Sequence, residues 1–235
     1  DSRAMAGTAT GSAMRAAALG LALALAACAP PDRLAALRRA CQGPADHPLA
    51  DLHRSLCIAE GGGGPALILQ IGDSHTANDS FSGRMRELFR DRFGDAGRGM
   101  LPPGIPHRWY RPEGVSVAAD GWTAVSAYRG AEGPFGIAAI RQRADRAARM
   151  EAMVADLSGE AEVEVLAQPG GGTVEVRRGG GPPVSLSTRS AETRAIWVAA
   201  PPSPGARTLA VEARGDGPVD VLAWRVGTGR SGTSY

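Results

Sequence analysis

The most constraining feature of the sequence is an apolar run that leads through a tight turn into an amphipathic segment. Residues 66–71 read ALILQI and are bounded by glycine and by a turn. A continuous apolar run of this length is typical of a strand that is buried on both faces of a parallel sheet. The residues from Gly72 to Thr76 read GDSHT and predict the turn. Strand, turn and helix form half of a β-α-β unit, so a partner strand is expected further along the chain.

Hydrophobic side chains recur at steps of three and four residues after this turn, which predicts a helix with one apolar face. Asn78 or Asp79 is expected to cap its start. The opposite face of the helix is expected to be polar and exposed. The apolar positions are Phe81, Met85, Leu88, Phe89 and Phe93, and the polar positions are Arg84, Arg86, Glu87, Arg90 and Asp91.

The N-terminal region has the pattern of an export signal. Met14 and Arg15 precede an apolar run, residues 16–27, that is too short to span a bilayer as a helix. A basic start, a short apolar stretch and small residues at its end are typical of a secretory signal, and residues 1–13 are expected to lie upstream of the natural start. The run ends as LAAC at Cys28, which resembles a bacterial lipobox. We therefore expect lipidation of Cys28 and a lipoprotein in the periplasm or outer membrane; the alternative is an ordinary signal peptide in which Cys28 is incidental.

Export changes the interpretation of the other two cysteines, Cys41 and Cys57, which are 16 residues apart. An oxidising periplasm permits a disulfide between them, closing a small loop between two short helices expected around residues 34–40 and 49–56. Two buried free thiols are the alternative. No metal site is expected, because there is no Cys-x-x-Cys pair and the four histidines are not at ligand spacing with the cysteines.

The remainder of the chain combines many turn residues with short segments of β-strand patterning. Glycine occurs 32 times and proline 17 times, which favours many turns and few long helices. Several short strands at this spacing suggest a sandwich or a jelly roll. For residues 138–157, the pattern does not distinguish a helix from strands. The expected strands are 114–119, 122–128, 161–167, 173–177, 194–198, 208–213 and 219–226.

The charged residues argue against a nucleic-acid partner. The chain has 26 basic and 24 acidic residues, which are scattered among one another and leave a net charge of +2. No basic patch of the kind that binds phosphate backbones is present in this pattern. A hydrophobic content of 43% is enough for a core, and a charged content of 21% argues against wholesale disorder.

Ser74 is the candidate nucleophile. A serine hydroxyl attacks a carbonyl only when a base removes its proton. In a turn between strand and helix the hydroxyl is exposed at the carboxyl edge of the sheet, where helix N-terminal amides can stabilise an oxyanion. The turn differs from the Gly-x-Ser-x-Gly elbow of α/β-hydrolases. Its residues Gly72, Asp73, Ser74 and His75 resemble the first block of the SGNH/GDSL hydrolases.

This resemblance extends from Leu67 to Gly104, which is similar to the start of the peptidoglycan O-acetylesterases of that superfamily. Those enzymes remove acetyl groups from the 6-hydroxyl of muramic acid, and they carry a carbohydrate-binding-type β-sandwich inserted just after this region. Residues 109–115 and 133–137 are similar to that insert. The resemblance therefore implies an α/β fold, the start of a flavodoxin-like, three-layer SGNH domain with an inserted sandwich. The implied boundaries are 1–28 for leader and signal, 29–104 for the SGNH part, 105–229 for the sandwich and 230–235 for the return to the SGNH domain.

By the same resemblance, Ser74 is the nucleophile that accepts the acyl group, and its backbone N–H is one oxyanion donor. Gly72 and Asp73 shape the turn. His75 is expected to make local hydrogen bonds instead of acting as the base, because neighbouring side chains in a turn point apart. The family's base lies in an Asp-x-x-His motif near its C-terminus.

The sequence departs from the family pattern after the sandwich. No histidine follows His107 and no asparagine follows Asn78. We therefore expect a truncated chain that lacks its base, its orienting acid and the other two oxyanion donors, and that is close to inactive as written. We also expect the sandwich to be better ordered than the SGNH part, because the strand at residues 67–71 lacks its neighbours.

The resemblance implies a serine esterase that removes O-acetyl groups from cell-wall peptidoglycan or a related glycan, needs no cofactor, and contacts the membrane through its lipid anchor. A glycan-binding lipoprotein without catalysis and an exported O-acetyltransferase on the same scaffold are the alternatives. Trp122, Trp197 and Trp224 are candidates for a sugar-stacking face, but their alternation with valine and alanine favours packing in the core.

Overall fold

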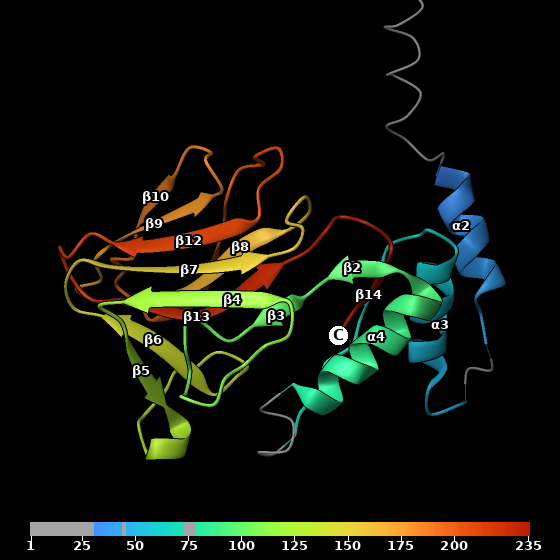
Figure 1. The fold of residues 1–235 in the computed structure, drawn as a ribbon, viewed down its shortest axis with the longest axis horizontal. Coiled ribbons are helices and arrows are strands. Elements are labelled where there is room, and N and C mark those ends of the chain that lie inside the picture. Colours follow the sequence, from blue (N-terminus) through green and yellow to red (C-terminus); the bar gives the residue numbers. More distant parts are fainter. Residues whose placement is uncertain (1–30, 44–45, 73–78) are drawn as a thin grey trace, which may run out of the picture.

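The computed structural model describes residues 31–43, 46–72 and 79–235. Figure 1 shows a helical part with a small sheet beside a larger, all-β part. The described helices are α2 (Pro31–Ala40), α3 (Ala50–Glu60), α4 (Ser80–Phe93) and the short 3-10 helix η1 (Ala127–Arg129). None of the helices in the described part of the chain has the length and hydrophobicity that crossing a membrane requires.

The small sheet consists of three short parallel strands in the order β1-β14-β2. These strands are β1 (Pro65–Leu67), β14 (Gly232–Ser234) and β2 (Asp95–Gly97). The middle strand therefore comes from the opposite end of the sequence. Helices α3 and α4 pack on this sheet, where Leu56 and Phe89 join a small core around Ala66. Strands β1 and β2 are parallel and flank α4 in the sequence, with β14 between them in the sheet; the sequence predicts a partner strand further along the chain, whereas β2 begins two residues after α4 ends.

The expectation of a strand buried on both faces is wrong. Strand β1 is only three residues long, and its partner among the described residues is β14 alone. Leu67, Leu69 and Ile71 are 73%, 59% and 85% exposed. The helices cover the face that carries Ala66 and Ile68, and the alternate residues lie on the other side. The three-layer SGNH arrangement stays a prediction, because the described part of the chain is mostly β.

Helices α2 and α3 form a lead-in to the small sheet, as the sequence predicts. A disulfide joins Cys41, directly after α2, to Cys57 in α3. The Ser231 hydroxyl donates to the carbonyl oxygens of Ala59 and Gly64, at 2.8 Å each. These contacts connect the end of α3 to the strand at the other end of the sequence.

The larger part consists of two antiparallel sheets, with strand orders β10-β9-β12-β7-β4 and β11-β8-β13-β6-β5. Strand β3 joins the second sheet by pairing with β13. The strands of the first sheet are β4 (Val115–Asp120), β7 (Ala148–Val154), β9 (Thr173–Arg178), β10 (Val184–Ser187) and β12 (Thr208–Ala213). Those of the second are β3 (Gly99–Leu101), β5 (Thr123–Ser126), β6 (Ile140–Ala144), β8 (Ala161–Ala167), β11 (Arg194–Ala199) and β13 (Val219–Val226).

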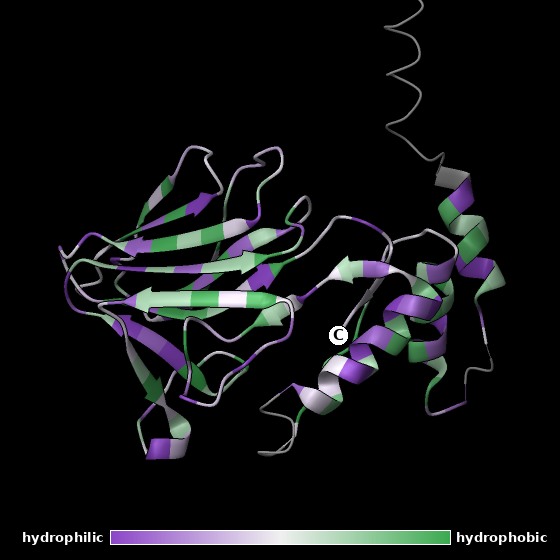
Figure 2. Ribbon diagram, in the orientation of Figure 1, coloured by the Kyte–Doolittle hydropathy of each residue, from purple (hydrophilic) through white to green (hydrophobic). Residues whose placement is uncertain are grey.

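One hydrophobic core joins the two antiparallel sheets into a sandwich. Met150 and Val211 of the first sheet belong to the same buried cluster as Val163 and Trp224 of the second. Along the strands, hydrophobic and hydrophilic residues follow one another, as Figure 2 shows. This alternation places one set of side chains in the core and the other on the surface.

The strands of the sandwich lie close to where the patterning predicts them. Residues 138–157, which the sequence leaves open, form the antiparallel strands β6 and β7. Core packing is the role of Trp224, which is 1% exposed, and of Trp122, which packs against the core. It is not the role of Trp197, which is 38% exposed on the edge strand β11. The very short strands β2, β3, β10 and β14 have too few residues to give a periodic signal.

Candidate functional site

The predicted active-site turn is described only at its first residue, Gly72, which follows β1 and is exposed. Asp73, Ser74 and His75 lie outside the described residues, as does Cys28. In the sequence, Ser74 comes after the end of β1 and before the start of α4. The candidate site is therefore built from the described residues that surround the end of β1 and the N-terminus of α4.

Asp79, directly before α4, is the hub of this region. Its φ of 61° is in the left-handed range, which few residues other than glycine adopt. The side chain makes no capping hydrogen bond to the helix backbone, unlike the cap that the sequence predicts. The carboxylate instead accepts hydrogen bonds from Ser82 Oγ at 2.5 Å, Arg86 Nη2 at 2.6 Å, the Glu113 backbone N–H at 2.8 Å and Arg98 Nη2 at 3.4 Å.

Arg86 corrects a second expectation, because the sequence places it on the exposed face of the helix. The residue is 4% exposed. Its Nε donates to the backbone oxygen of Tyr235 at 3.2 Å, while its Nη1 lies 3.7 Å from the Glu113 carboxylate. The pairing with Asp79 explains the burial, because a guanidinium enters the interior only with hydrogen-bonded partners. Arg86 thereby links α4 to the residue that follows β14.

The pKa of Asp79 reflects these contacts. Burial alone raises it, but the hydrogen bonds from Arg86, Ser82 and the Glu113 backbone, together with the Arg98 charge, lower the pKa below its usual value. The carboxylate is therefore ionised at neutral pH. An ionised acceptor with two arginines as donors is the strong form of this interaction.

Arg98 and Tyr110 are buried beside this hub with unused donors. The Arg98 side chain is 10% exposed. Its Nε and Nη1 atoms and the Tyr110 hydroxyl have no hydrogen-bond partner among the described residues. Burial, followed by the Arg86 charge, lowers the pKa of Arg98 to about 10, and burial raises the pKa of Tyr110 to about 12. Both groups therefore keep their protons at neutral pH. The Arg98 guanidinium can act only as a hydrogen-bond donor, whereas the Tyr110 hydroxyl can also act as a weak acceptor.

A cavity of about 420 Å³ opens beside these groups, between the uncovered face of β1, the start of α4 and the segment that contains β3. This volume lies in the range of small-molecule sites. Its wall is largely apolar and includes a few charged groups. The lining includes Leu67, Leu69, Asp79, Arg86, Arg98, Met100, Tyr110, Ile137, Arg225 and Tyr235.

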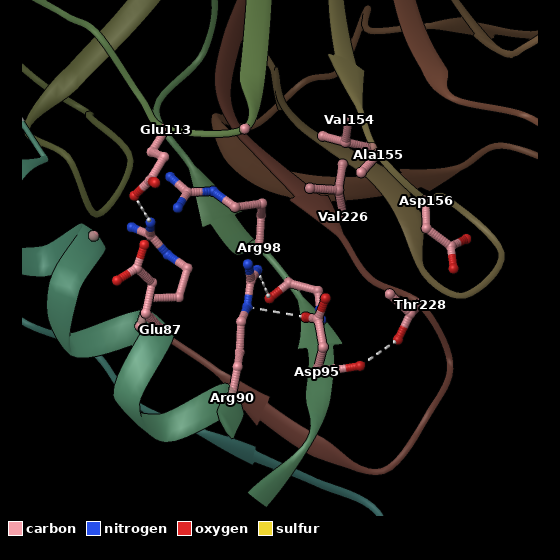
Figure 3. Close-up of a pocket in the computed structure, with 14 residues that line it drawn as sticks. Glu87, Arg90, Asp95, Arg98, Glu113, Val154, Ala155, Asp156, Val226 and Thr228 are labelled. Carbon is pink, nitrogen blue, oxygen red and sulfur yellow. Dashed lines mark hydrogen bonds and ion pairs between the residues drawn. The ribbon is translucent and has the colours of Figure 1, made fainter. Parts of the chain in front are cut away.

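A second cavity, of about 260 Å³, lies between α4 and the sandwich and shares Arg86 and Arg98 with the first. Figure 3 shows Arg90 paired with Asp95 at one side of it, at 3.1 Å. Asp156, which pairs with Arg230 at 2.7 Å, lies on the sandwich side. This cavity is lined by acids and arginines that neutralise one another. The first cavity is larger and has the more apolar wall, so it is the better candidate ligand site.

The chemistry of the first cavity is that of binding and orientation. The arginines of its lining can hold an oxygen-rich group, and its apolar side chains exclude water from a ligand. In the described ranges, no group of three histidine, cysteine or acidic side chains gathers to hold a metal ion. The described residues supply no paired nucleophile and base, so catalysis depends on the predicted Ser74.

Sequence reasoning missed Asp79, Arg98 and Tyr110 as site residues. One signal was present: Asp79 and Arg86 are seven residues apart, so two turns of helix bring them to one face. Arg98 and Tyr110 carry no such signal. They reach the site because β2 and the loop before β4 fold back over α4, which only the tertiary structure decides.

Comparisons with known proteins place this geometry in a structural context. No protein-family model matches the sequence, and no curated protein matches it. Among solved structures, a peptidoglycan O-acetylesterase is similar with 23% identity and a TM-score of 0.57, covering 77% of this chain and 48% of that one. This chain thus spans about half the length of that structure.

Two further solved structures have lower scores. A family two carbohydrate esterase from Cellvibrio japonicus is 14% identical, with a TM-score of 0.34, covering 56% of this chain and 33% of that one. CsCBM6-3 from Clostridium stercorarium, in complex with cellobiose, is 13% identical, with a TM-score of 0.35, covering 55% of this chain and 92% of that one. Only the first match is strong enough to show a shared fold. The chain therefore has the fold of the matching part of a peptidoglycan O-acetylesterase.

Proposed function

We propose that this chain belongs to a serine esterase of the SGNH type that removes O-acetyl groups from cell-wall peptidoglycan or a related glycan. The observation that carries the proposal is the position of Ser74 within Gly72-Asp73-Ser74-His75, between β1 and α4. The fold shared with part of a peptidoglycan O-acetylesterase supports it. So does the cavity beside the start of α4, which is lined by arginines and apolar side chains.

In the proposed reaction, the Ser74 hydroxyl oxygen attacks the acetyl carbonyl carbon while a base takes the hydroxyl proton. The tetrahedral oxyanion collapses, the sugar oxygen leaves with a proton, and an acetyl ester remains on Ser74. Water then attacks this ester and releases acetate. The resemblance to SGNH hydrolases implies that the base is the histidine of an Asp-x-x-His motif; no histidine follows His107 in this sequence of 235 residues. The described part of the chain contributes substrate orientation.

The test is acetate release from O-acetylated peptidoglycan by the product of the complete open reading frame. We expect release by the wild type and a loss of at least about a thousandfold in Ser74→Ala, since the acyl-enzyme cannot form. Sequencing past the codon for Tyr235 belongs to the same experiment. An Asp-x-x-His motif there supports the esterase, and equal acetate release by Ser74→Ala would refute it.

A glycan-binding lipoprotein without catalysis is the second candidate, favoured by the exposed Trp197 on the sandwich. An exported O-acetyltransferase would use the same serine and pass the acetyl group to a sugar hydroxyl instead of to water. Acetylated sugar acceptors in the reaction mixture would identify the transferase. We also propose that Cys28 is lipidated after export; labelling with a radioactive fatty acid, lost in Cys28→Ser, tests that part.

A further inference from the structure

Trp197 is an exposed aromatic side chain within a strand of the sandwich. Trp122 and Trp224 pack in or against the core, whereas Trp197 lies 38% exposed on β11. Large aromatic side chains on a sheet face cost hydrophobic free energy when they stay in water, so an exposed tryptophan that has charged neighbours invites an explanation.

The neighbours of Trp197 are two carboxylates and one guanidinium. The Arg225 guanidinium carbon lies 4.7 Å from the centroid of the Trp197 ring. Arg225 Nε also donates to Glu162 at 2.7 Å. Glu164 is directly opposite Trp197 in the pairing of β11 with β8. Burial raises the pKa of Glu164 against the opposing effect of Arg225, so Arg225 acts on this carboxylate too.

These side chains share the outward face of the second sheet. Trp224 and Val163 point into the core, so the alternate residues Arg225, Glu162 and Glu164 point outward. Met100 of β3, 40% exposed, is paired with Arg225 in the register of β3 and β13. The row of outward side chains, formed by Trp197, Glu162, Glu164, Arg225 and Met100, therefore crosses four strands, β11, β8, β13 and β3.

This row is continuous with the cavity beside α4. Met100 and Arg225 both line the 420 Å³ cavity, while Arg225 also stacks on Trp197. A ligand longer than the cavity would therefore leave it across Arg225 and reach Trp197 on the open sheet face. Glu162 and Glu164 of β8 lie between Arg225 and Trp197 in the order of the strands, so the ligand would also pass these carboxylates.

The chemistry of the row selects a neutral, hydroxyl-rich ligand. A flat indole packs against the C–H face of a ring, carboxylates accept hydrogen bonds from hydroxyls, and a guanidinium donates in a fixed fork. Two acids beside one arginine leave no strong positive charge for a phosphate. The Glu162 pair holds the guanidinium in place before the ligand arrives, which reduces the entropy cost of binding.

We infer that Trp197, Arg225 and Glu164 form a distal sugar subsite, which binds a unit of the glycan chain remote from the unit in the cavity. The glycan identity rests on the proposed function, whereas the subsite itself rests on the sheet geometry. The subsite would let the sandwich position the polymer for the cavity.

The test measures binding of the 235-residue chain to purified O-acetylated peptidoglycan sacculi by co-sedimentation. Trp197→Ala is expected to weaken binding at least about fivefold, the effect of truncating an aromatic contact residue. Trp197→Phe is expected to retain most of the binding. The matched control is Tyr128→Ala, which removes an aromatic side chain that is 96% exposed on η1, away from the row. Circular dichroism checks that each variant is folded.

The outcomes separate this inference from the proposed function. Wild-type binding that Trp197→Ala weakens and Tyr128→Ala leaves unchanged supports the subsite, even if no acetate is released. Equal binding by Trp197→Ala and the wild type overturns the subsite, even if acetate release depends on Ser74. Absence of binding by the wild-type chain, or an equal loss in Tyr128→Ala, also overturns it.

Discussion

A single carboxylate holds together three segments around the start of α4. Asp79 accepts hydrogen bonds from Ser82 and Arg86 of α4, from Arg98 after β2, and from the backbone of Glu113 before β4. Each of these hydrogen bonds alone contributes modestly to stability. If the ion pairs between the carboxylate and the arginines are broken, however, buried charges remain without a partner, and this is costly. The arrangement of the segments that follow the predicted nucleophile therefore depends on this residue.

Substituting this carboxylate tests its importance for stability. Asp79→Asn keeps the shape but removes the charge, so Arg86 and Arg98 stay buried without a counterion. We expect the free energy of unfolding to fall by about 2–4 kcal/mol at pH 7. Urea denaturation measures the change, and Asp91→Asn, on the exposed side of the same helix, is the control with an expected effect within about 0.5 kcal/mol. An equal effect of the two substitutions would contradict the hub.

The pH dependence of stability follows from the same group. The folded-state pKa of Asp79 is lower than its unfolded value of about 3.9, so its contribution is fully present above that value and is lost as the pH falls through the folded-state pKa. We expect wild-type stability to decline below about pH 4 more steeply than that of Asp79→Asn. Urea midpoints measured between neutral and acidic pH give both curves; parallel curves would refute the assignment.

At the scale of elements, the lead-in helices are attached to the small sheet by few contacts. The disulfide between Cys41 and Cys57 joins the end of α2 to α3, and Ser231 connects α3 to β14. Among the described residues, the buried members of the hydrophobic cluster under α3 and α4 are Leu56, Ala59 and Ala66. A covalent link matters most where the core is this small.

Removing the disulfide is expected to destabilise this helical part. The bridged cysteines are 16 residues apart, and a loop of this size corresponds to about 3 kcal/mol. The double variant Cys41→Ser and Cys57→Ser should lose α2 and α3 protection at lower urea concentration. Hydrogen exchange of the α3 amides measures the loss, while the amides of β8 serve as the internal control. Unchanged α3 exchange would contradict this expectation.

At the scale of the whole molecule, the two parts differ in how their strands are supported. Central strands of the sandwich, such as β8 and β13, have neighbours on both edges and side chains in the common core. Strand β1 has three residues, one partner among the described strands and an exposed face. Because local stability follows buried contacts and paired backbone groups, we expect the sandwich to be the more stable part.

This difference predicts the order of local unfolding. Amides of β8 and β13 should exchange more slowly than those of β1 by several orders of magnitude, since they open only with the sandwich. Hydrogen exchange followed by mass spectrometry measures both. Limited proteolysis that spared residues 66–93 while digesting 110–228 would contradict the prediction.

The sequence by itself determined most of the local structure of this protein. Alternation of apolar residues located β8, β12 and β13, and helical periodicity located α4, because both signals depend on neighbours in the chain. The Gly72-Asp73-Ser74-His75 block marked the candidate nucleophile, although its last three residues lie outside the described part. The same patterning misplaced Arg86, because it records hydropathy and not the partner that allows a charge to be buried.

Only the tertiary structure decided which distant residues meet. Asp79 gained Arg98 and Glu113, and Trp197 gained Arg225, through strand pairing and loop return between segments far apart in the sequence. The single exposed face of β1 was decided in the same way, by helices that cover one side of a three-residue strand. Local periodicity cannot encode these contacts, because long-range pairing is set by the packing of whole elements around a common core.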